Sequence, residues 1–185
     1  METRIAAEGA VDRIRDPAAR TAQDYFPEAY EQTRDQVFRY LRRFALDDDE
    51  AADLAARTFE RAFTKLASYR GERDGFGAWL FRIARTQGID AIRRRHQAFP
   101  LDFLRPEQHP HAGDGRPEDD LVANEESREL ATLVQRLPRV GRECLALRYD
   151  AGLTARQIGQ VIGKSEAATQ KMISRALDRL REEYR

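Results

Sequence analysis

The stretch from Leu153 to Leu180 holds residues that can cap and turn two short helices. Ser165 is a good N-cap for the second helix, and Glu166 favours its positive N-terminal end. The second helix of such a pair can enter a DNA major groove with its N-terminal end first, so we predict that side chains near its start contact DNA.

A pair of short helices must position these side chains. Thr154 can cap the first helix, with Gln157 as its capping-box partner, and Gly163 is free to take the positive φ of a tight turn. The apolar residues recur at three- and four-residue steps: Ile158, Val161, Ile162, Thr169, Met172, Ile173, Ala176 and Leu180. This pattern predicts a helix-turn-helix whose second helix enters the major groove. The alternative is an αα-hairpin that packs for stability alone.

Aromatic and basic residues alternate in a second stretch, which begins at Tyr69. Its members are Tyr69, Arg70, Arg73, Phe76, Trp79, Phe81, Arg82 and Arg85. This mixture suits single-stranded nucleic acid, since aromatic faces stack on bases and cations hold the backbone. The alternative is that Phe76 and Trp79 are core residues, and the apolar neighbours of Trp79 at helical spacing favour that interpretation for Trp79.

The charges of the chain are segregated although its formal net charge is +0. Basic residues are in excess over 79–97 and 139–185, and acidic residues are in excess over 98–127. Two basic blocks around an acidic segment favour two contacts with a polyanion. Cys144 is the one cysteine. With no internal disulfide, no membrane-length apolar run and no signal-peptide core, we expect a cytoplasmic protein.

Helical periodicity organises the chain into two all-α domains. Residues 1–24 read as an N-terminal tail, and 25–97 form a first domain with helices over about 27–45, 49–67 and 77–97. Residues 98–124 are acidic and rich in proline and glycine, which is typical of a flexible linker. Residues 125–185 form the second domain, which contains the helix-turn-helix.

Three stretches, in order, resemble one family. They are DLAARTFERAF at 53–63, YRGERDGFGAWLFRIARTQGIDAIRRR at 69–95 and LPRVGRECLALRYDAGLTARQIGQVIGKSEAATQKMISRALDRLRE at 137–182. Together they resemble the extracytoplasmic-function (ECF) sigma factors, the two-domain group 4 of the bacterial sigma-70 family. The resemblance implies a sigma2-like and a sigma4-like domain that bind core RNA polymerase, melt and read a −10 promoter element and read a −35 element.

The resemblance also implies site residues and partners. The helix that meets the β′ clamp helices of core polymerase would use Asp53, Leu54, Arg57, Thr58, Phe59, Arg61 and Phe63. The −10 element would be held by Arg70, Gly71, Phe76, Arg82, Arg85, Arg93, Arg94 and Arg95. The −35 element would be read by Lys164, Ser165, Glu166, Ala167, Gln170, Lys171 and Arg175. Further expected partners are the β flap of polymerase, promoter DNA and an anti-sigma factor, without membrane insertion.

Two other functions were compared with this one. A stand-alone helix-turn-helix regulator would bind duplex DNA without polymerase, but it would leave 53–63 and 69–95 without a purpose. An enzymatic function is not supported, because the sequence shows no nucleophile and base at a catalytic spacing, no phosphate-binding loop and no cluster of metal ligands. We therefore expect no catalytic residues, no cofactor and no metal.

One departure from the family pattern concerns the helix-turn-helix itself. Gly159 stands where alanine is frequent in the family. A glycine inside a helix costs ~1 kcal/mol relative to alanine, so we expect Gly159 to loosen the first helix of the pair.

Overall fold

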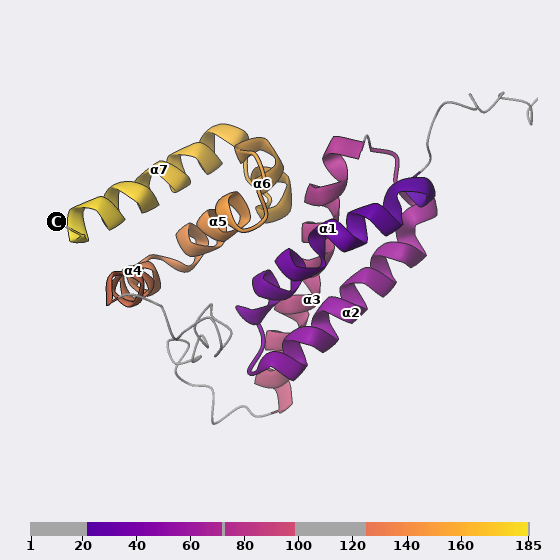
Figure 1. Cartoon of the computed structure of the whole chain (residues 1–185), viewed down its shortest axis with the longest axis horizontal. Helices are drawn as coiled ribbons and strands as arrows, with labels where there is room; N and C mark the ends of the chain where they lie inside the picture. The colour runs from indigo at the N-terminus through magenta and orange to yellow at the C-terminus, as the bar shows by residue number, and fades with distance from the viewer. Residues whose placement is uncertain (1–21, 72, 99–124, 185) are drawn as a thin grey trace, which may run out of the picture.

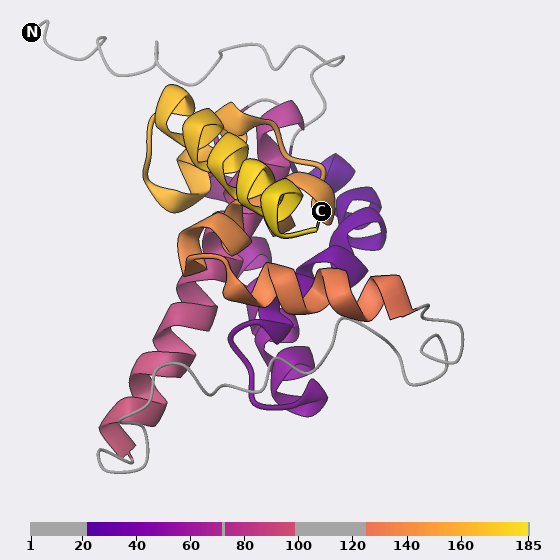
Figure 2. The same ribbon diagram turned by 90° about the vertical axis from the view of Figure 1, so that its left-hand side faces the viewer.

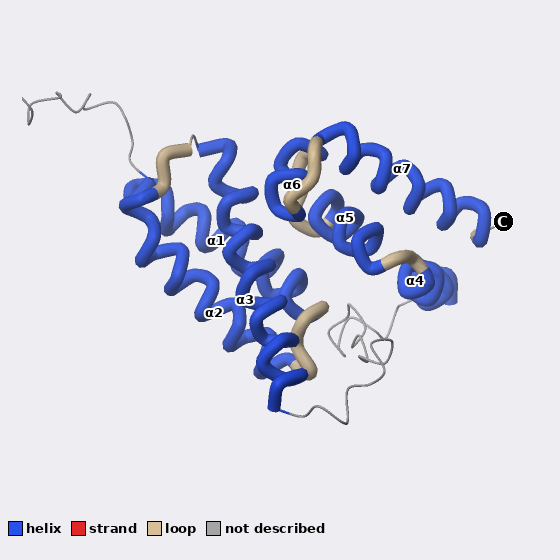
Figure 3. The backbone as a smooth tube through the Cα atoms, turned by 180° about the vertical axis from the view of Figure 1, so that it is seen from behind, coloured by secondary structure: helices blue, strands red, loops and turns tan. Residues whose placement is uncertain are grey.

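The computed structural model describes residues 22–71, 73–98 and 125–184, and every regular element in these ranges is a helix (Figures 1 and 3). The N-terminal unit contains α1 (Ala22–Arg42), α2 (Asp48–Lys65) and α3 (Phe76–Ala98), with short 3-10 turns η1 (Leu66–Ser68) and η2 (Arg73–Gly75) between α2 and α3. The C-terminal unit contains α4 (Glu125–Arg136), α5 (Arg139–Tyr149), α6 (Ala155–Ile162) and α7 (Glu166–Glu183). The all-α prediction is confirmed for these ranges. The predicted linker over 98–124 lies outside them except for Ala98, as does most of the predicted tail.

The N-terminal unit is a three-helix bundle whose second helix starts at a reciprocal cap. The Asp47 carboxylate accepts a hydrogen bond from the Glu50 N–H at 2.8 Å, and the Glu50 carboxylate accepts one from the Leu46 N–H at 2.7 Å. The first bond satisfies an amide that the first turn of a helix leaves unpaired, and the second ties the residue before the cap to the helix. The core of the bundle is fully buried and includes Tyr40, Leu41, Leu54, Leu80 and Phe81.

The C-terminal unit has the helix-turn-helix that the sequence predicts. Thr154 and Gln157 form both halves of a capping box at the start of α6. Gly163 ends α6 with φ 73°, a left-handed conformation that glycine adopts without steric cost. The Ser165 hydroxyl then accepts a hydrogen bond from the Ala168 N–H at 3.3 Å and caps α7. Local sequence signals therefore determine both helix ends and the turn between them.

The surroundings of Gly159 oppose the effect expected from helix propensity. A Cβ atom at this position would lie 2.6 Å from the Lys164 carbonyl oxygen and 3.2 Å from Thr169 Oγ1. The Lys164 N–H also donates to the Gly159 carbonyl at 2.9 Å, so the turn approaches α6 closely at this residue. Helix propensity takes no account of this crowding, because alanine at position 159 would fit only if the turn were displaced.

The two units pack against each other through one continuous apolar core. Residues of the C-terminal unit that belong to the same buried cluster as the N-terminal bundle are Cys144, Leu147, Leu153, Ile158 and Val161. Figures 1 and 2 show α5 and α6 facing the bundle, while the C-terminal end of α3 projects away from the packed region. None of the described helices is long and apolar enough to span a bilayer.

Burial of Cys144 gives a prediction for its reactivity. The side chain is 0% exposed. Burial first, and the nearby Glu143 carboxylate second, raise the pKa of the Cys144 thiol from 9.0 to about 11. The thiolate is the reactive form, so we expect Ellman's reagent to modify the folded chain at pH 8 far more slowly than the urea-unfolded chain. Equal rates in the two states would contradict this burial.

The same shift predicts a pH dependence of stability. The folded state favours the neutral thiol, so this contribution is fully present below about pH 9 and is lost as the pH rises through about 11. We expect the free energy of unfolding, measured with urea, to fall over this window. In the Cys144→Ala variant that part of the fall should be absent, and an identical fall in both proteins would assign it to other groups.

Candidate nucleic-acid and partner interfaces

The start of α7 presents every side chain that the sequence predicts for −35 recognition. These residues are all exposed: Lys164, Ser165, Glu166, Ala167, Gln170, Lys171 and Arg175. The opposite side of the helix is anchored in the core by Thr169 at 0% and Ala176 at 5% exposure. The Thr169 hydroxyl donates to the Ser165 carbonyl at 2.9 Å. The helix therefore holds a polar, partly cationic surface on a rigid support, as groove recognition requires.

The loop between α2 and α3 is built around an aromatic cluster. Tyr69 lies 5.6 Å from Phe76 and 5.0 Å from Trp79, centroid to centroid, and Phe26 of α1 meets Phe76 edge-on at 6.1 Å. Such tilted and edge-to-face pairs stabilise the loop beyond their buried area. Phe76 is only 3% exposed, so its ring offers no face to a base in this conformation. Trp79 is half-buried, in agreement with its interpretation as a core residue.

Arg70 is a cationic residue of this loop. It is exposed, and its guanidinium reaches back to the Ala67 carbonyl at 2.6 Å. The backbone of the next residue, Gly71, lies close to the Tyr69 ring. A Cβ atom at Gly71 would lie 2.5 Å from Tyr69 Oη. The loop thus exposes a cation beside a fixed aromatic surface.

The predicted −10 arginines of α3 divide into two groups. Arg82, Arg93 and Arg94 are exposed. The last two belong to the C-terminal part of α3, the helix whose end projects in Figure 2. Arg85 and Arg95 are instead engaged within the fold. Arg85 Nε donates to Glu143 Oε1 at 2.8 Å, and Arg95 pairs with Glu50 and with the Phe44 carbonyl. Both guanidiniums therefore make contacts within the protein, although the Arg85 side chain is still 30% exposed, against 13% for Arg95.

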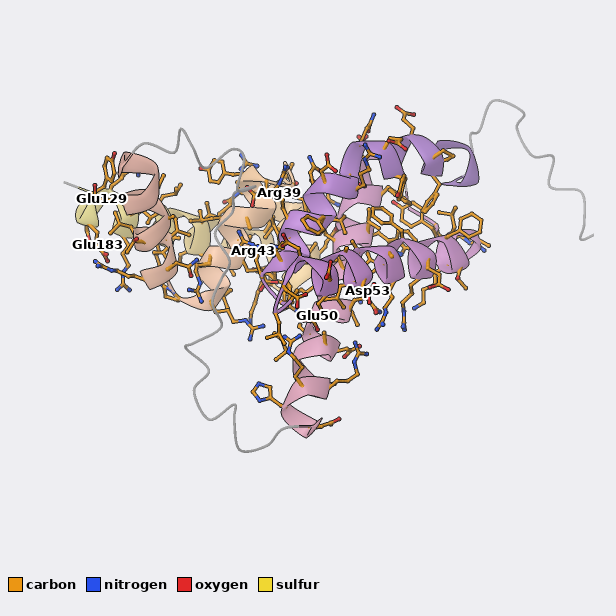
Figure 4. All side chains as sticks on the ribbon, turned by 60° about the horizontal axis from the view of Figure 1, so that its bottom comes forward. Arg39, Arg43, Glu50, Asp53, Glu129 and Glu183 are labelled. Atoms are coloured by element: carbon orange, nitrogen blue, oxygen red, sulfur yellow. The ribbon has the colours of Figure 1, made fainter. Side chains whose placement is uncertain are left out.

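The outer face of α2 carries only some of the residues predicted for the clamp contact. Asp53, Arg57, Arg61 and Phe63 are exposed, and Figure 4 shows Asp53 on this helix. The other three predicted residues, Leu54, Thr58 and Phe59, are at most 8% exposed and pack in the bundle core. They can hold the helix in place but cannot touch a partner directly.

A hollow lies beside this outer face, between α2 and α3. Its volume is about 420 Å³, and it is lined by Arg57, Glu60, Arg61, Thr64, Lys65 and Gln87. We refer to the exposed residues Asp53, Arg57, Arg61 and Phe63 together with this hollow as the α2 surface. Four residues that line the hollow are not in the set predicted for the clamp contact: Glu60, Thr64, Lys65 and Gln87. The first three lie three or four positions from Arg57 or Arg61 on the same helix, and this spacing is the signal that could have identified them.

Comparison with known families assigns both units. The model of Sigma-70 region 2 matches residues 29–98, and that of Sigma-70 region 4 matches residues 127–180. The chain is 32% identical over 165 residues to the ECF RNA polymerase sigma factor SigD of Mycobacterium tuberculosis (strain ATCC 25618 / H37Rv), covering 84% of this chain and 75% of SigD. The chain belongs to the ECF RNA polymerase sigma factors.

Other relatives of this sigma factor agree with that assignment. BldN of Streptomyces coelicolor is 30% identical over 155 residues, which cover 83% of this chain but 58% of BldN. SigW of Bacillus subtilis is 28% identical over 170 residues, covering 88% of this chain and 90% of SigW. Both are ECF RNA polymerase sigma factors. The chain thus spans less than two thirds of the length of BldN and nearly all of SigW.

Two solved structures share the fold of this sigma factor. RpoE of Bartonella quintana, in complex with the anti-sigma factor NepR, has a TM-score of 0.61 at 20% identity, covering 85% of this chain and 95% of RpoE. CnrH, in complex with the cytosolic domain of CnrY, has a TM-score of 0.57 at 22% identity, covering 86% and 87%. At these identities the likeness concerns the fold alone.

Sequence reasoning missed the contacts that join the two units. Tyr40 and Arg43 lie in the helix predicted over 27–45, and Glu143 lies in the second domain. The sequence predicts no role for these three residues, although they form hydrogen bonds between the units. Figure 4 shows Arg43 where α1 faces the C-terminal unit. Glu143 interrupts the apolar side of α5 as a buried carboxylate, and a charge at an apolar position is the signal that could have revealed it.

Proposed function

We propose that this sigma factor binds core RNA polymerase and directs promoter-specific initiation, with the C-terminal unit reading a −35 element and the N-terminal unit melting and holding a −10 element. The observation that carries the proposal is the exposed row of side chains at the capped start of α7. This row is a candidate surface for reading DNA bases, and the chain belongs to a family whose members are RNA polymerase sigma factors.

The −35 contact follows from the chemistry of that row. Lys171 and Arg175 are one helical turn apart, and Gln170 is adjacent, so three donors face outward from the first half of α7. Cationic donors suit guanine or phosphate, and the glutamine amide suits adenine. The positive N-terminal end of α7 is also favourable for a phosphate.

Replacing Arg175 with alanine tests this contact. A good base contact is worth ~1–3 kcal/mol, so we expect transcription from a −35-dependent promoter to fall about tenfold or more, while binding to core polymerase is retained. Quantitative run-off transcription and a parallel pull-down would measure the two effects. Unchanged transcription from the cognate promoter would remove Arg175 from the −35 contact.

The proposed −10 contact uses the loop at the N-terminal end of α3. Arg70 would hold the backbone beside a base that leaves the stack, at a cost of a few kcal/mol that contacts in the protein must offset. Arg82, Arg93 and Arg94 would hold neighbouring phosphates. Phe76 would support the loop from the core, and direct stacking on its ring would require the aromatic cluster to open.

The proposed polymerase contact is the α2 surface. Its exposed arginines and Phe63, which is 66% exposed, are the residue types that dominate protein interfaces. An anti-sigma factor is the second proposed protein partner. Support for it comes from RpoE of Bartonella quintana, which was solved in complex with the anti-sigma factor NepR.

In vitro transcription tests the proposal as a whole. Purified chain and bacterial core polymerase would be mixed with a library of genomic promoter fragments, and the RNA starts would be sequenced. We expect starts that need both proteins and share two spaced upstream motifs. If no starts appear and a pull-down shows no binding to core polymerase, the sigma mechanism is overturned in favour of a stand-alone DNA-binding regulator.

A further inference from the structure

The hollow between α2 and α3 combines an exposed charged rim with a buried amide. Figure 1 shows these two helices side by side. All of its lining residues except one belong to α2 and are exposed, and the exception, Gln87, comes from α3. Gln87 is only 7% exposed and still lines the hollow. Its side chain therefore forms part of the floor, and the α2 residues form the rim.

The Gln87 amide makes no hydrogen bond within the part of the chain that the structure describes. The amide is not sealed in the core either, since the fully buried unpaired side-chain atoms among those residues are Nε of Arg43 and Nε of Arg95. Most buried polar groups in proteins are paired, and an unpaired one is costly. Water or a ligand in the hollow is the partner left to this amide.

The rim supplies cations that the fold does not use. Arg57, Arg61 and Lys65 follow one another at four-residue steps, which places them ~6 Å apart along the helix axis. Among the described residues, Arg61 and Lys65 have no ion-pair partner, and Arg57 has only its 4.0 Å contact with Asp53. Guanidinium and ammonium groups that face one hollow form a site for an anion, and arginine matches the oxygens of a phosphate especially well.

Glu60 indicates that the ligand is more than an anion. Its carboxylate lies on the same rim and would repel a polyphosphate or a nucleic-acid backbone that followed the helix. A carboxylate and an amide are instead groups that recognise the polar edge of a base. The hollow thus combines a part suited to phosphate with a part suited to a base. Its volume of about 420 Å³ lies within the range of small-molecule sites, roughly 300–1,000 Å³.

We propose that this hollow is a binding site for a small nucleotide, whose phosphate is held by Arg61 and Lys65 and whose base is contacted by Gln87 and Glu60. The binding itself does not rest on the proposed function. One consequence does, because the hollow belongs to the α2 surface, the proposed polymerase contact. Nucleotide and core polymerase then compete for the same face of α2, and each lowers the affinity for the other.

Calorimetric titration of the full chain tests the site directly. The probes are the four ribonucleoside 5′-monophosphates, the matching nucleosides and inorganic phosphate, at fixed ionic strength. We expect at least one nucleotide to bind tenfold or more tightly than its nucleoside and than phosphate. Absence of nucleotide binding up to millimolar concentrations, or equal affinities for phosphate and the nucleotide, would overturn the proposal. Tighter binding of a single-stranded DNA oligonucleotide with the same dependence on Gln87 would also overturn it, in favour of a DNA-strand site.

The Gln87→Leu variant connects binding to the amide. Leucine has a similar size, and no internal hydrogen bond is lost, so we expect urea unfolding to show no loss of stability. Nucleotide affinity should fall about fivefold, the worth of one ordinary hydrogen bond. Gln160→Leu, on the exposed side of α6, is the matched control and should keep native affinity. A destabilised Gln87→Leu variant, or equal affinities for the two leucine variants, would overturn the role of the amide.

A second pair of variants tests the phosphate contacts. Arg61→Gln/Lys65→Gln changes exposed residues only, and we expect it to lower nucleotide affinity at least tenfold, because charge-assisted hydrogen bonds are lost. Arg34→Gln/Arg179→Gln removes the same charge from two exposed positions elsewhere and should keep native affinity. An equal loss in both double variants would assign the effect to net charge and overturn the site.

Competition tests the consequence for polymerase. We expect a saturating nucleotide to weaken binding of the labelled native chain to core polymerase severalfold, and to weaken binding of Gln87→Leu much less at the same concentration. A polymerase affinity that the nucleotide leaves unchanged would overturn the competition. Failure of the proposed function is distinguishable, because a chain that does not bind polymerase can still be titrated with nucleotide, and the titration needs neither polymerase nor DNA.

Discussion

Reversing the charges of Arg57 and Arg61 is expected to lower affinity for core RNA polymerase on the order of 1,000-fold, because central interface arginines are each worth about 2 kcal/mol or more. Both side chains are exposed on the α2 surface, and Arg57 makes only a weak 4.0 Å pair with Asp53. Neither belongs to the core, so the Arg57→Glu/Arg61→Glu variant should keep its helical content. Its affinity can be measured with labelled core polymerase at fixed salt.

A control with the same change in charge isolates the contact. Arg34→Glu/Arg179→Glu also replaces two surface arginines, and the side chains of Arg34, Arg179 and Arg57 are 53%, 52% and 55% exposed. We expect this control to keep nearly native affinity. If both double variants lose affinity equally, the loss reflects net charge, and if neither does, the α2 surface is not the polymerase contact.

Replacing Gly159 with valine is expected to destabilise the helix-turn-helix by about 3 kcal/mol, the upper part of the usual range for overpacking. The new Cβ would meet the Lys164 carbonyl oxygen, which is backbone and is tied to the same turn by the Lys164 N–H bond to Gly159. The clash can be relieved only by moving the start of α7, so −35 binding should fall with stability. Urea unfolding and a duplex-binding assay would measure both.

Two further substitutions make this result interpretable. Gln160→Val places the same β-branched residue on the exposed side of α6 and should cost only the difference in helix propensity, ~0.5 kcal/mol. Gly159→Ala decides the sign, because propensity alone predicts a gain of ~1 kcal/mol, whereas the crowding at Lys164 predicts a loss. A stabilised Gly159→Ala variant would show that the turn can move away from α6.

The helix-turn-helix shows how much of a site can be predicted from local sequence. Thr154, Gly163 and Ser165 act through their own backbone neighbours, and the structure confirms each of their roles. The exposure of the α7 residues follows from the same local periodicity, because one face of an amphipathic helix is buried and the other is not.

On the α2 surface, helical periodicity predicts which residues are buried better than the family motif does. The predicted clamp set mixed exposed and buried residues because it followed the family motif, although Leu54 and Phe59 lie on the apolar stripe. The stripe itself predicts their burial. The hollow beside Arg57 could not be predicted from the sequence, because Gln87 belongs to α3 and only the packing of α3 against α2 brings it next to Arg57.

The sequence by itself determined the helices, their caps, the turn of the helix-turn-helix and the polar row on α7, because these depend on interactions within a few residues. Only the tertiary structure decided that Phe76 is buried, that Arg85 and Arg95 are engaged, and that the Lys164 carbonyl crowds the position of a Cβ on Gly159. It also decided that the two units share a core. These outcomes depend on contacts between residues distant in the chain, and neither composition nor periodicity encodes which surfaces meet.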